Sequence, residues 1–308
     1  TLFRSLLPIL MGLRKFFLRL ALISAPFSFV FGVVVVVDPY NYFNWSHVVD
    51  DAVKLKNLNH DGRTMAFSNL MWKMKEYRRT PVPNVLIGDS RLSYFDLEHL
   101  AKVTGKPWYN FGVPGGNHRT AADVFGYIDS IASPGTVWMQ VSFRNMAAGQ
   151  DYDLYSEPFA VESTPGLYVS NRRVLAASAL ALKASWSPES VQYDVLAPDH
   201  WNNVVDMETE AATNFIMDTS FYARLESIAR HCRLRGTELL LIEWPAYHEL
   251  HGIRSAAGLD PLQAGYRERL GSIATYVDLD TLGNPISADR NNYRDPLHLT
   301  VEGQRKLV

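Results

Sequence analysis

The first residue whose surroundings suggest chemistry is a serine that follows a short apolar run. Residues 85–87 lead into Gly88, Asp89 and Ser90. Gly88 permits a tight turn, so the Ser90 hydroxyl would be presented at the start of a following helix, where backbone N–H groups point outward. A serine in this position needs a neighbouring base before it can act as a nucleophile. The alternative is that Ser90 only caps the helix.

A base and its partner are predicted close to the other end of the chain. Asp295 precedes His298 by three residues. This spacing can bring the carboxylate onto one ring nitrogen of the imidazole, which leaves the other nitrogen to face a serine. Alone, His298 could equally be a histidine in a surface loop. Because Ser90 follows the first predicted strand and His298 lies in the last loop, we interpret them as a catalytic pair oriented by Asp295.

Alternating strands and helices are predicted to position these residues. The predicted strands are residues 85–87, 108–111, 136–141, 238–242 and 275–279. The predicted helices are residues 62–79 (capped by Asp61), 92–103, 121–131, 221–235, 261–272 and a last one from 301 onward. This alternation indicates an α/β fold of three layers with about five parallel strands. Ligands of such sheets bind at the carboxyl ends of the strands, where both candidate residues are expected.

Composition sets wider limits on the chain. Its 308 residues, 47% hydrophobic and 20% charged, suffice for one large domain or two modest ones. A net charge of −2 gives no reason to expect a nucleic-acid partner. The one cysteine, Cys232, is expected to be a small helix residue. Residues 147–220 interrupt the alternation, so we expect an insertion near the site, partly helical around residues 174–183.

The N-terminal segment has the pattern of a membrane anchor. Residues 1–37 contain basic residues and no acidic one, and residues 20–37 form an 18-residue run without charge. About 20–22 helical residues cross a hydrocarbon core of about 30 Å. The basic residues Arg14, Lys15 and Arg19 should stay in the cytoplasm.

This pattern predicts a division of the chain into a cytoplasmic segment (1–15), a single transmembrane span (16–37), a juxtamembrane segment with a helix (38–82) and an extracytoplasmic catalytic domain (83–308). A cleaved signal peptide is the alternative. It is disfavoured because five valines run directly into Asp38, without the small residues that precede a cleavage site.

The motifs named above resemble those of the SGNH (GDSL-type) hydrolase superfamily, over about residues 84–308. That family has a flavodoxin-like sheet and sequence blocks that contain Gly-Asp-Ser, a glycine, an asparagine and a late Asp-x-x-His. The resemblance implies that Ser90 is the nucleophile, His298 the general base and Asp295 its orienting partner. It also implies that the N–H of Gly112 helps to form the oxyanion hole, and it implies no cofactor.

The asparagine block departs from the family pattern. The usual Gly-x-Asn-Asp is replaced by the four residues 142–145, Ser-Phe-Arg-Asn. Asn145 is the one amide there that could donate to an oxyanion, although it is shifted by one position. Without it, the hole would depend on the N–H groups of Ser90 and Gly112. Arg144 could instead bind an anionic group or an acyl carbonyl.

A third group of candidates follows the fourth predicted strand. Trp244, Tyr247 and His248 are expected to line the substrate, because they should lie at the rim of the site; a purely structural role is the alternative. His248 and His251 are three residues apart, whereas the zinc-binding helix signature needs a spacing of four. We therefore predict no metal site.

The predicted anchor bears on the acceptor of the acyl group. A single span before an external SGNH domain resembles the accessory proteins of polysaccharide O-acetylation, including that of alginate, and of teichoic acid D-alanylation. The resemblance implies a bacterial cytoplasmic membrane, a multi-span membrane-bound O-acyltransferase partner and transfer of an acyl group, commonly acetyl, to a glycan. The alternatives are a membrane-tethered esterase or deacetylase, and a non-catalytic subunit of an acyltransferase complex.

Overall fold

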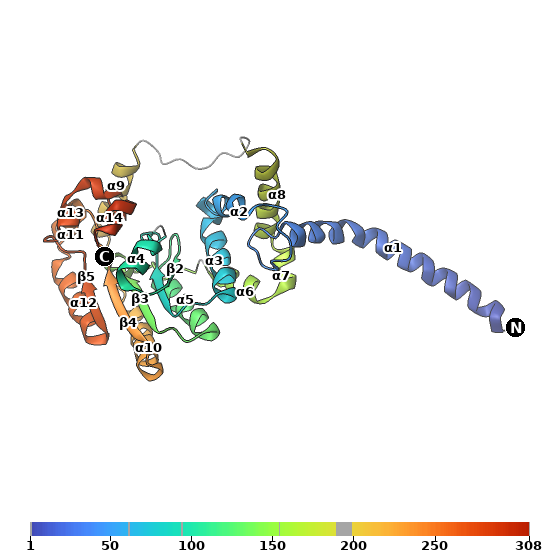
Figure 1. Cartoon of the computed structure of the whole chain (residues 1–308), viewed down its shortest axis with the longest axis horizontal. Coiled ribbons are helices and arrows are strands. Elements are labelled where there is room, and N and C mark those ends of the chain that lie inside the picture. Colours follow the sequence, from blue (N-terminus) through green and yellow to red (C-terminus); the bar gives the residue numbers. More distant parts are fainter. Residues whose placement is uncertain (1, 61, 94, 154, 189–198, 308) are drawn as a thin grey trace. The chain divides into compact units, whose positions relative to one another are not determined.

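The computed structural model describes residues 2–60, 62–93, 95–153, 155–188 and 199–307. Contacts divide the chain into two compact units (Figure 1). The smaller unit comprises Thr1–His60 and Ala160–Tyr193, and the larger comprises Asp61–Phe159 and Asp194–Val308. The predicted helical cap Asp61 lies outside the described residues.

The larger unit contains a five-stranded parallel sheet with the order β2-β1-β3-β4-β5. Its strands are β1 (Asn84–Gly88), β2 (Trp108–Gly112), β3 (Thr136–Val141), β4 (Glu238–Glu243) and β5 (Thr275–Asp278). This order is that of flavodoxin-like sheets, whose ligands bind where the order reverses, between β1 and β3. The predicted α/β class, with about five parallel strands, is confirmed, and the strands agree with the predicted ranges to within one residue at each end.

Helices flank the sheet. They are α3 (Gly62–Arg79), α4 (Leu97–Thr104), α5 (His118–Ile131), α9 (His200–Thr213), α10 (Ser220–Arg235), α11 (His248–Ala256), α12 (Asp260–Ile273), α13 (Pro285–Ala288) and α14 (Val301–Arg305). Cys232 is buried in α10, and Gly236 ends that helix in a left-handed conformation (φ 72°). A short antiparallel ladder of β6 (Tyr293–Asp295) and β7 (His298–Leu299) precedes α14.

The helix predicted from residue 92 begins five residues later, so that prediction was wrong at its start. Residues 90–93 instead form a turn, in which the N–H groups of Leu92 and Ser93 donate to the carbonyls of Asp89 and Ser90. The side chain of Asp96 accepts the N–H of His99 at 2.9 Å and caps the true start of α4.

Helix α3 belongs to the larger unit, although the sequence placed it in the juxtamembrane segment. Its Lys73 Nζ donates to the carbonyl of Asn110 in β2 at 2.7 Å, and Tyr109 of β2 donates through its hydroxyl to Glu76 at 2.7 Å. These bonds join α3 to the sheet edge. The boundary between the units therefore falls near residue 61 and not near residue 83.

The predicted insertion is helical over more of its length than expected. Besides α9 it contains α6 (Ser156–Ser163), α7 (Pro165–Ser170) and α8 (Arg172–Trp186), and α8 covers the predicted helix at residues 174–183. The insertion is shared between the units, because α7 and α8 pack with the N-terminal segment, whereas α9 belongs to the larger unit.

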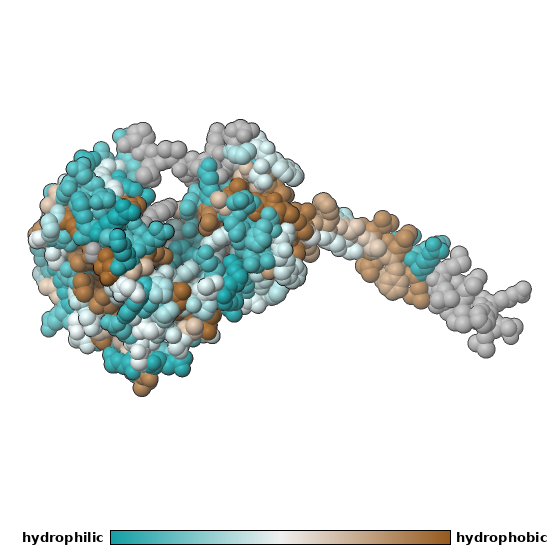
Figure 2. Space-filling model, in the orientation of Figure 1, coloured by the Kyte–Doolittle hydropathy of each residue, from teal (hydrophilic) through white to brown (hydrophobic). Residues whose placement is uncertain are grey.

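The smaller unit contains α1 (Leu2–Val37), and Figure 2 shows hydrophobic residues along much of it. Its segment Leu13–Val37 is long and apolar enough to cross a membrane. The last turn differs from the predicted span, because Val34 and Val37 are 1% and 2% exposed. Val37 packs with Val49 and Ala181 in a local core, so this end of the apolar run is covered by protein.

A buried carboxylate ends α1. Asp38 adopts φ +43° and accepts the N–H groups of Tyr42, Phe43 and Asn44 at 2.7–2.8 Å. It also accepts the Tyr168 hydroxyl of α7 at 2.8 Å. Four donors on one carboxylate fix the chain reversal directly after the apolar helix.

Candidate active site

Three side chains from the two ends of the larger unit form a hydrogen-bonded chain. Ser90 Oγ lies 2.8 Å from Nε2 of His298. Nδ1 of His298 lies 2.8 Å from both carboxylate oxygens of Asp295. Because an ionised carboxylate only accepts, Nδ1 carries a proton, and neutral His298 therefore presents an unprotonated Nε2 to the serine hydroxyl. The three residues singled out from the sequence are brought together by the structure.

Asp295 is held in its ionised form. Its Oδ1 accepts the N–H groups of Leu297 and His298 at 2.9 and 3.0 Å, and Oδ2 lies 3.2 Å from Nε2 of His200. Burial raises the pKa of Asp295, but the hydrogen bonds from His298, Leu297 and His200 and the charge of His298 outweigh it and hold the pKa at about 2. The carboxylate is therefore charged at neutral pH, as stabilisation of an imidazolium requires.

The turn that carries Ser90 is fixed by a buried ion pair. Arg91 is 8% exposed and donates through Nη2 to Oδ2 of Asp89 at 2.7 Å. Gln140 of β3 donates to Oδ1 of Asp89 at 3.0 Å and accepts the Asp89 N–H at 3.0 Å. The positive charge of Arg91 and these hydrogen bonds lower the pKa of Asp89 against the burial that raises it. Ser90 thus lies between Asp89, which Gln140 of β3 holds, and Arg91, which is bound to Asp89.

Two paired glycines make room for this turn. Gly88 and Gly112 lie opposite each other at the ends of β1 and β2. A Cβ on Gly112 would lie 2.6 Å from Leu92 Cβ, and one on Gly88 would lie 2.6 Å from Leu92 Cδ1. Both distances are shorter than carbon atoms tolerate, so the turn that carries Ser90 can pack on these strand ends only where both residues lack a side chain.

The N–H of Gly112, which was predicted to donate to the oxyanion, has another partner in the structure. Its N–H donates at 2.6 Å to Oδ1 of Asn110 and is therefore occupied. Asn110 is held in turn, because its Nδ2 donates at 2.6 Å to the carbonyl of Leu92. The Ser90 N–H, by contrast, makes no hydrogen bond with any residue that the structure describes.

The asparagine block lies in the 3-10 helix η1 (Phe143–Met146), after β3. Asn145 lines a small cavity with His118 and Phe221, and none of the described contacts joins its amide to Ser90. Arg144 forms an ion pair, because its Nε lies 2.5 Å from Oε1 of Glu208 in α9. The predicted roles of Asn145 and Arg144 therefore stay predictions.

Two buried titratable side chains fix η1. His118 accepts the Ser142 N–H at 3.3 Å through Nε2 and stacks on Phe221 at 3.8 Å. Burial lowers the pKa of His118 to about 3, so its imidazole is neutral. Glu243, at the end of β4, accepts the N–H of Phe143 at 3.1 Å.

The environment of Glu243 favours its protonated form. The hydroxyl of Tyr266 donates to Oε2 of Glu243 at 2.8 Å, which lowers the pKa of Glu243. Glu243 is only 2% exposed, however, and this burial acts in the opposite direction. Burial, together with the nearby charge of Asp280, raises the pKa of Glu243 to about 8. Glu243 was not predicted from the sequence. Its position as an acidic residue at the end of the apolar strand β4 is the feature that could have indicated it.

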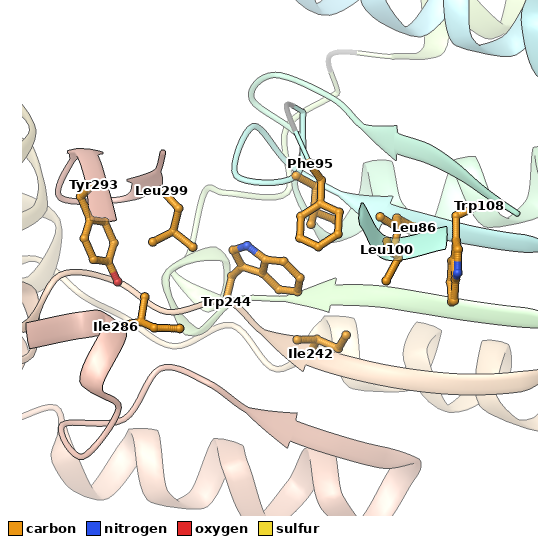
Figure 3. Packing of buried hydrophobic residues seen from close by; sticks show 10 residues of the cluster. Leu86, Phe95, Leu100, Trp108, Ile242, Trp244, Ile286, Tyr293 and Leu299 are labelled. Carbon is orange, nitrogen blue, oxygen red and sulfur yellow. The ribbon is translucent and has the colours of Figure 1, made fainter. Parts of the chain in front are cut away.

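Trp244 was predicted to line the substrate, and the structure contradicts this. It is 3% exposed and packs edge-on against Phe95 at 5.5 Å, inside the hydrophobic cluster drawn in Figure 3. Leu86 of β1 and Leu299 of β7 belong to the same cluster. Trp244 therefore supports the strand ends beneath the site from within the core.

Tyr247 and His248 lie closer to the loop that carries Asp295 and His298. The Tyr247 N–H donates to the carbonyl of Pro296 at 2.9 Å, and its ring lies 4.3 Å from that of the exposed His248. His251 is directed elsewhere, because its Nε2 lies 3.1 Å from Asp280. The two histidines of this segment therefore do not converge, and the described residues contain no group of three His, Cys, Asp or Glu that could hold a metal ion.

No protein-family model and no curated protein matches the chain. A Streptococcus pneumonia structure provisionally described as a platelet activating factor shares 18% identity and covers 82% of this chain and 92% of its own, with a TM-score of 0.41. A G-D-S-L family lipolytic protein of Desulfitobacterium hafniense, also provisionally described, shares 12% identity over 72% of this chain and 93% of its own (TM-score 0.37). A similarly described acylhydrolase of Bacteroides fragilis shares 14% identity and covers 75% of this chain and 90% of its own, with a TM-score of 0.36. The chemical assignment therefore depends on the geometry of this chain.

Proposed function

We propose that this protein is an SGNH-type enzyme that transfers acyl groups through a covalent ester on Ser90. The observation that carries the proposal is the contact of 2.8 Å between Ser90 Oγ and His298 Nε2, with Asp295 at 2.8 Å from the other ring nitrogen. A serine, an unprotonated imidazole nitrogen and a charged carboxylate in this order are what acyl transfer by a serine requires.

The proposed reaction has two halves. Ser90 Oγ attacks the acyl carbonyl carbon, its proton passes to Nε2 of His298, and Asp295 stabilises the imidazolium. When the tetrahedral intermediate collapses, the bond to the leaving alcohol breaks and His298 returns the proton to that alcohol. In the second half, the oxygen of water or of a sugar hydroxyl attacks the ester carbonyl while His298 takes the proton from that oxygen. When the ester bond to Ser90 breaks, His298 returns the proton to Ser90 Oγ.

Stabilisation of the oxyanion is the weakest part of the site. The Ser90 N–H has no hydrogen-bond partner among the described residues, whereas the Gly112 N–H is bonded to Asn110. Loss of one donor costs serine enzymes on the order of 10²–10³ in rate. We therefore expect slow turnover of unactivated esters unless Asn110 rotates away when substrate binds.

We further propose that the acceptor is a glycan at the outer face of a bacterial cytoplasmic membrane. Helix α1 supports this, because a single apolar segment, Leu13–Val37, precedes the enzymatic unit and is preceded by residues without acidic side chains. A tether keeps the site beside a membrane-bound O-acyltransferase, which we propose as the partner that supplies acyl groups across the bilayer. The chemistry of the triad itself permits water as acceptor equally well.

Mass spectrometry after treatment with a fluorophosphonate tests the proposal. We expect one adduct on Ser90 of the full chain in detergent micelles and none in Ser90→Ala. With a chromogenic acetate ester and an oligosaccharide, acetylated oligosaccharide is expected. Release of acetate alone would instead identify the tethered esterase, and absence of any adduct on a folded protein would support the non-catalytic subunit.

A further inference from the structure

A second histidine shares the carboxylate of Asp295. Nε2 of His200 lies 3.2 Å from Oδ2, whereas the backbone N–H groups of Leu297 and His298 bind Oδ1. His200 is the first residue of α9, which lies in the segment that interrupts the strand and helix alternation. We propose that His200 is a positioning residue, which fixes the rotation of the Asp295 carboxylate and, by its charge, sets how readily His298 takes up a proton. This inference rests on the proposed function of Ser90.

The start of α9 is held against the catalytic loop by aromatic packing. Trp201 contacts Tyr247 edge-on at 5.2 Å, and the Arg290 guanidinium lies 4.1 Å from the centre of the Trp201 ring. Tyr247 in turn donates its N–H to Pro296, next to Asp295. His200 is therefore presented to the carboxylate by a packed helix terminus and not by a free side chain.

The middle of α9 is anchored to η1. Glu208, 6% exposed, forms an ion pair with Arg144 of η1 at 2.5 Å. The helix thus connects the segment after β3 with the loop that carries Asp295 and His298. A rigid helix held at both points limits the movement of His200 relative to the carboxylate.

The chemical effect follows from what Asp295 must do. Two backbone N–H groups bind its Oδ1, and Nδ1 of His298 lies 2.8 Å from both of its oxygens. His200 is therefore the second partner of Oδ2, and it comes from outside the loop that carries Asp295 and His298. A neutral His200 donates a hydrogen bond, and a protonated His200 adds a positive charge beside the carboxylate. That charge opposes protonation of His298 on the other side of Asp295.

Among the residues that the structure describes, several charged or titratable groups lie on the start of α9 or on elements that contact α9. They are Asp199 at the N-cap of α9, Asp295 and His298 on the ladder, Arg290 on η3 (Arg290–Asn292), and His248 and Glu249 on α11. Arg294, on β6, is exposed between two buried residues. His251 and Arg254 of α11 are engaged by Asp280, at 3.1 and 2.5 Å.

The variants His200→Ala and His200→Gln separate orientation from charge. His200→Ala should lower the rate of Ser90 modification by a fluorophosphonate about tenfold, the value of one hydrogen bond to a charged group. His200→Gln keeps a neutral donor and should restore most of that rate. In both variants the acidic limb of the rate against pH should move to higher pH, because no cation can form beside Asp295.

The matched control is His231→Ala, which removes another histidine bound to an aspartate. His231 lies on α10, and its Nε2 is 3.0 Å from Asp129. We expect this variant to keep the wild-type rate and pH profile. The second readout is the rate at which diethyl pyrocarbonate modifies His298, followed by peptide mass spectrometry from pH 5 to 8. Since it needs no activity, it tests the role of His200 even if Ser90 proves unreactive in the wild type.

The expected result is a shift of the His298 modification profile to higher pH in His200→Ala and His200→Gln only. Profiles of both variants that coincide with that of the wild type would overturn the charge effect. A His200→Gln rate no better than that of His200→Ala would overturn the orienting hydrogen bond. An unreactive Ser90 together with a shifted His298 profile would remove the proposed function and leave the inference about His200 standing.

Discussion

Replacement of Arg91 by methionine should destabilise the larger unit through the charge that it leaves behind. Arg91 binds the carboxylate of Asp89 through Nε at 3.1 and 3.2 Å and through Nη2 at 2.7 Å. Loss of one partner of a buried pair costs about 3–5 kcal/mol. Because Gln140 and the Arg91 N–H still donate to Asp89, we expect the lower end, about 3 kcal/mol.

The loss should depend on pH. Arg91 now lowers the pKa of Asp89; without it, burial raises that pKa above its ordinary value. A carboxyl whose pKa is higher in the folded than in the unfolded state is stabilised when protonated, and this gain is lost as pH rises through the raised pKa. The free energy of unfolding of Arg91→Met should therefore fall from pH 5 to pH 8 relative to that of the wild type.

Urea unfolding of the full chain in detergent, followed by tryptophan fluorescence at both pH values, measures this difference. The double variant Asp89→Asn with Arg91→Met should recover most of the loss at pH 8, since no unpaired charge remains. Arg235→Met is the surface control: its exposed guanidinium lies 3.8 Å from Asp129, and exposed pairs contribute at most about 1 kcal/mol. A loss below about 1 kcal/mol for Arg91→Met, or one equal at both pH values, would refute the reasoning.

Two further predictions concern the strand ends around the site. Gly112→Ala should lower the free energy of unfolding by about 1–3 kcal/mol and slow Ser90 labelling, because the added Cβ would lie 2.6 Å from Leu92 Cβ. The control is Gly126→Ala, whose Cβ meets nothing within 4 Å and which should be neutral or stabilising in the same unfolding assay. Burial, with the charge of Asp280, raises the pKa of Glu243 to about 8, so melting temperature should decline as pH rises from about 4.5 to 8. Glu243→Gln should abolish that decline; an unchanged pH dependence in this variant would show that Glu243 is not its cause.

The sheet and the meeting of Ser90, Asp295 and His298 were predictable because local patterns determine them. Each strand is a short apolar run next to a helical period, and the parallel order brings the carboxyl ends of the strands to one edge. Ser90 and His298 both follow such ends, so their meeting required no knowledge of side-chain packing. The start of α4 was misplaced because Leu92 fits a helical period, although Asp96 is the residue with a capping side chain.

The errors concern side chains whose direction depends on tertiary contacts. Trp244 follows the end of β4, where the sequence cannot distinguish a residue that faces solvent from one that completes the core. Arg144 was considered as a binding residue for an anionic group because the sequence does not show its partner. That partner, Glu208, lies 64 residues further along the chain, in an insertion without strand periodicity. His200 was missed for the same reason, since nothing near it in sequence indicates Asp295.

The state of Gly112 limits what the triad can do in the conformation observed. For its N–H to reach an oxyanion, Asn110 must release it, and rotation of that side chain also breaks the bond from Nδ2 to the carbonyl of Leu92. Each of these bonds is worth about 0.5–1.5 kcal/mol net, which substrate binding must supply before the second donor becomes available. An acyl donor whose carbonyl displaces the Asn110 amide would gain that donor, whereas an ester that leaves Asn110 in place would depend on the Ser90 N–H. Discrimination between substrates can therefore arise at Asn110, two residues before the glycine that the family pattern indicates.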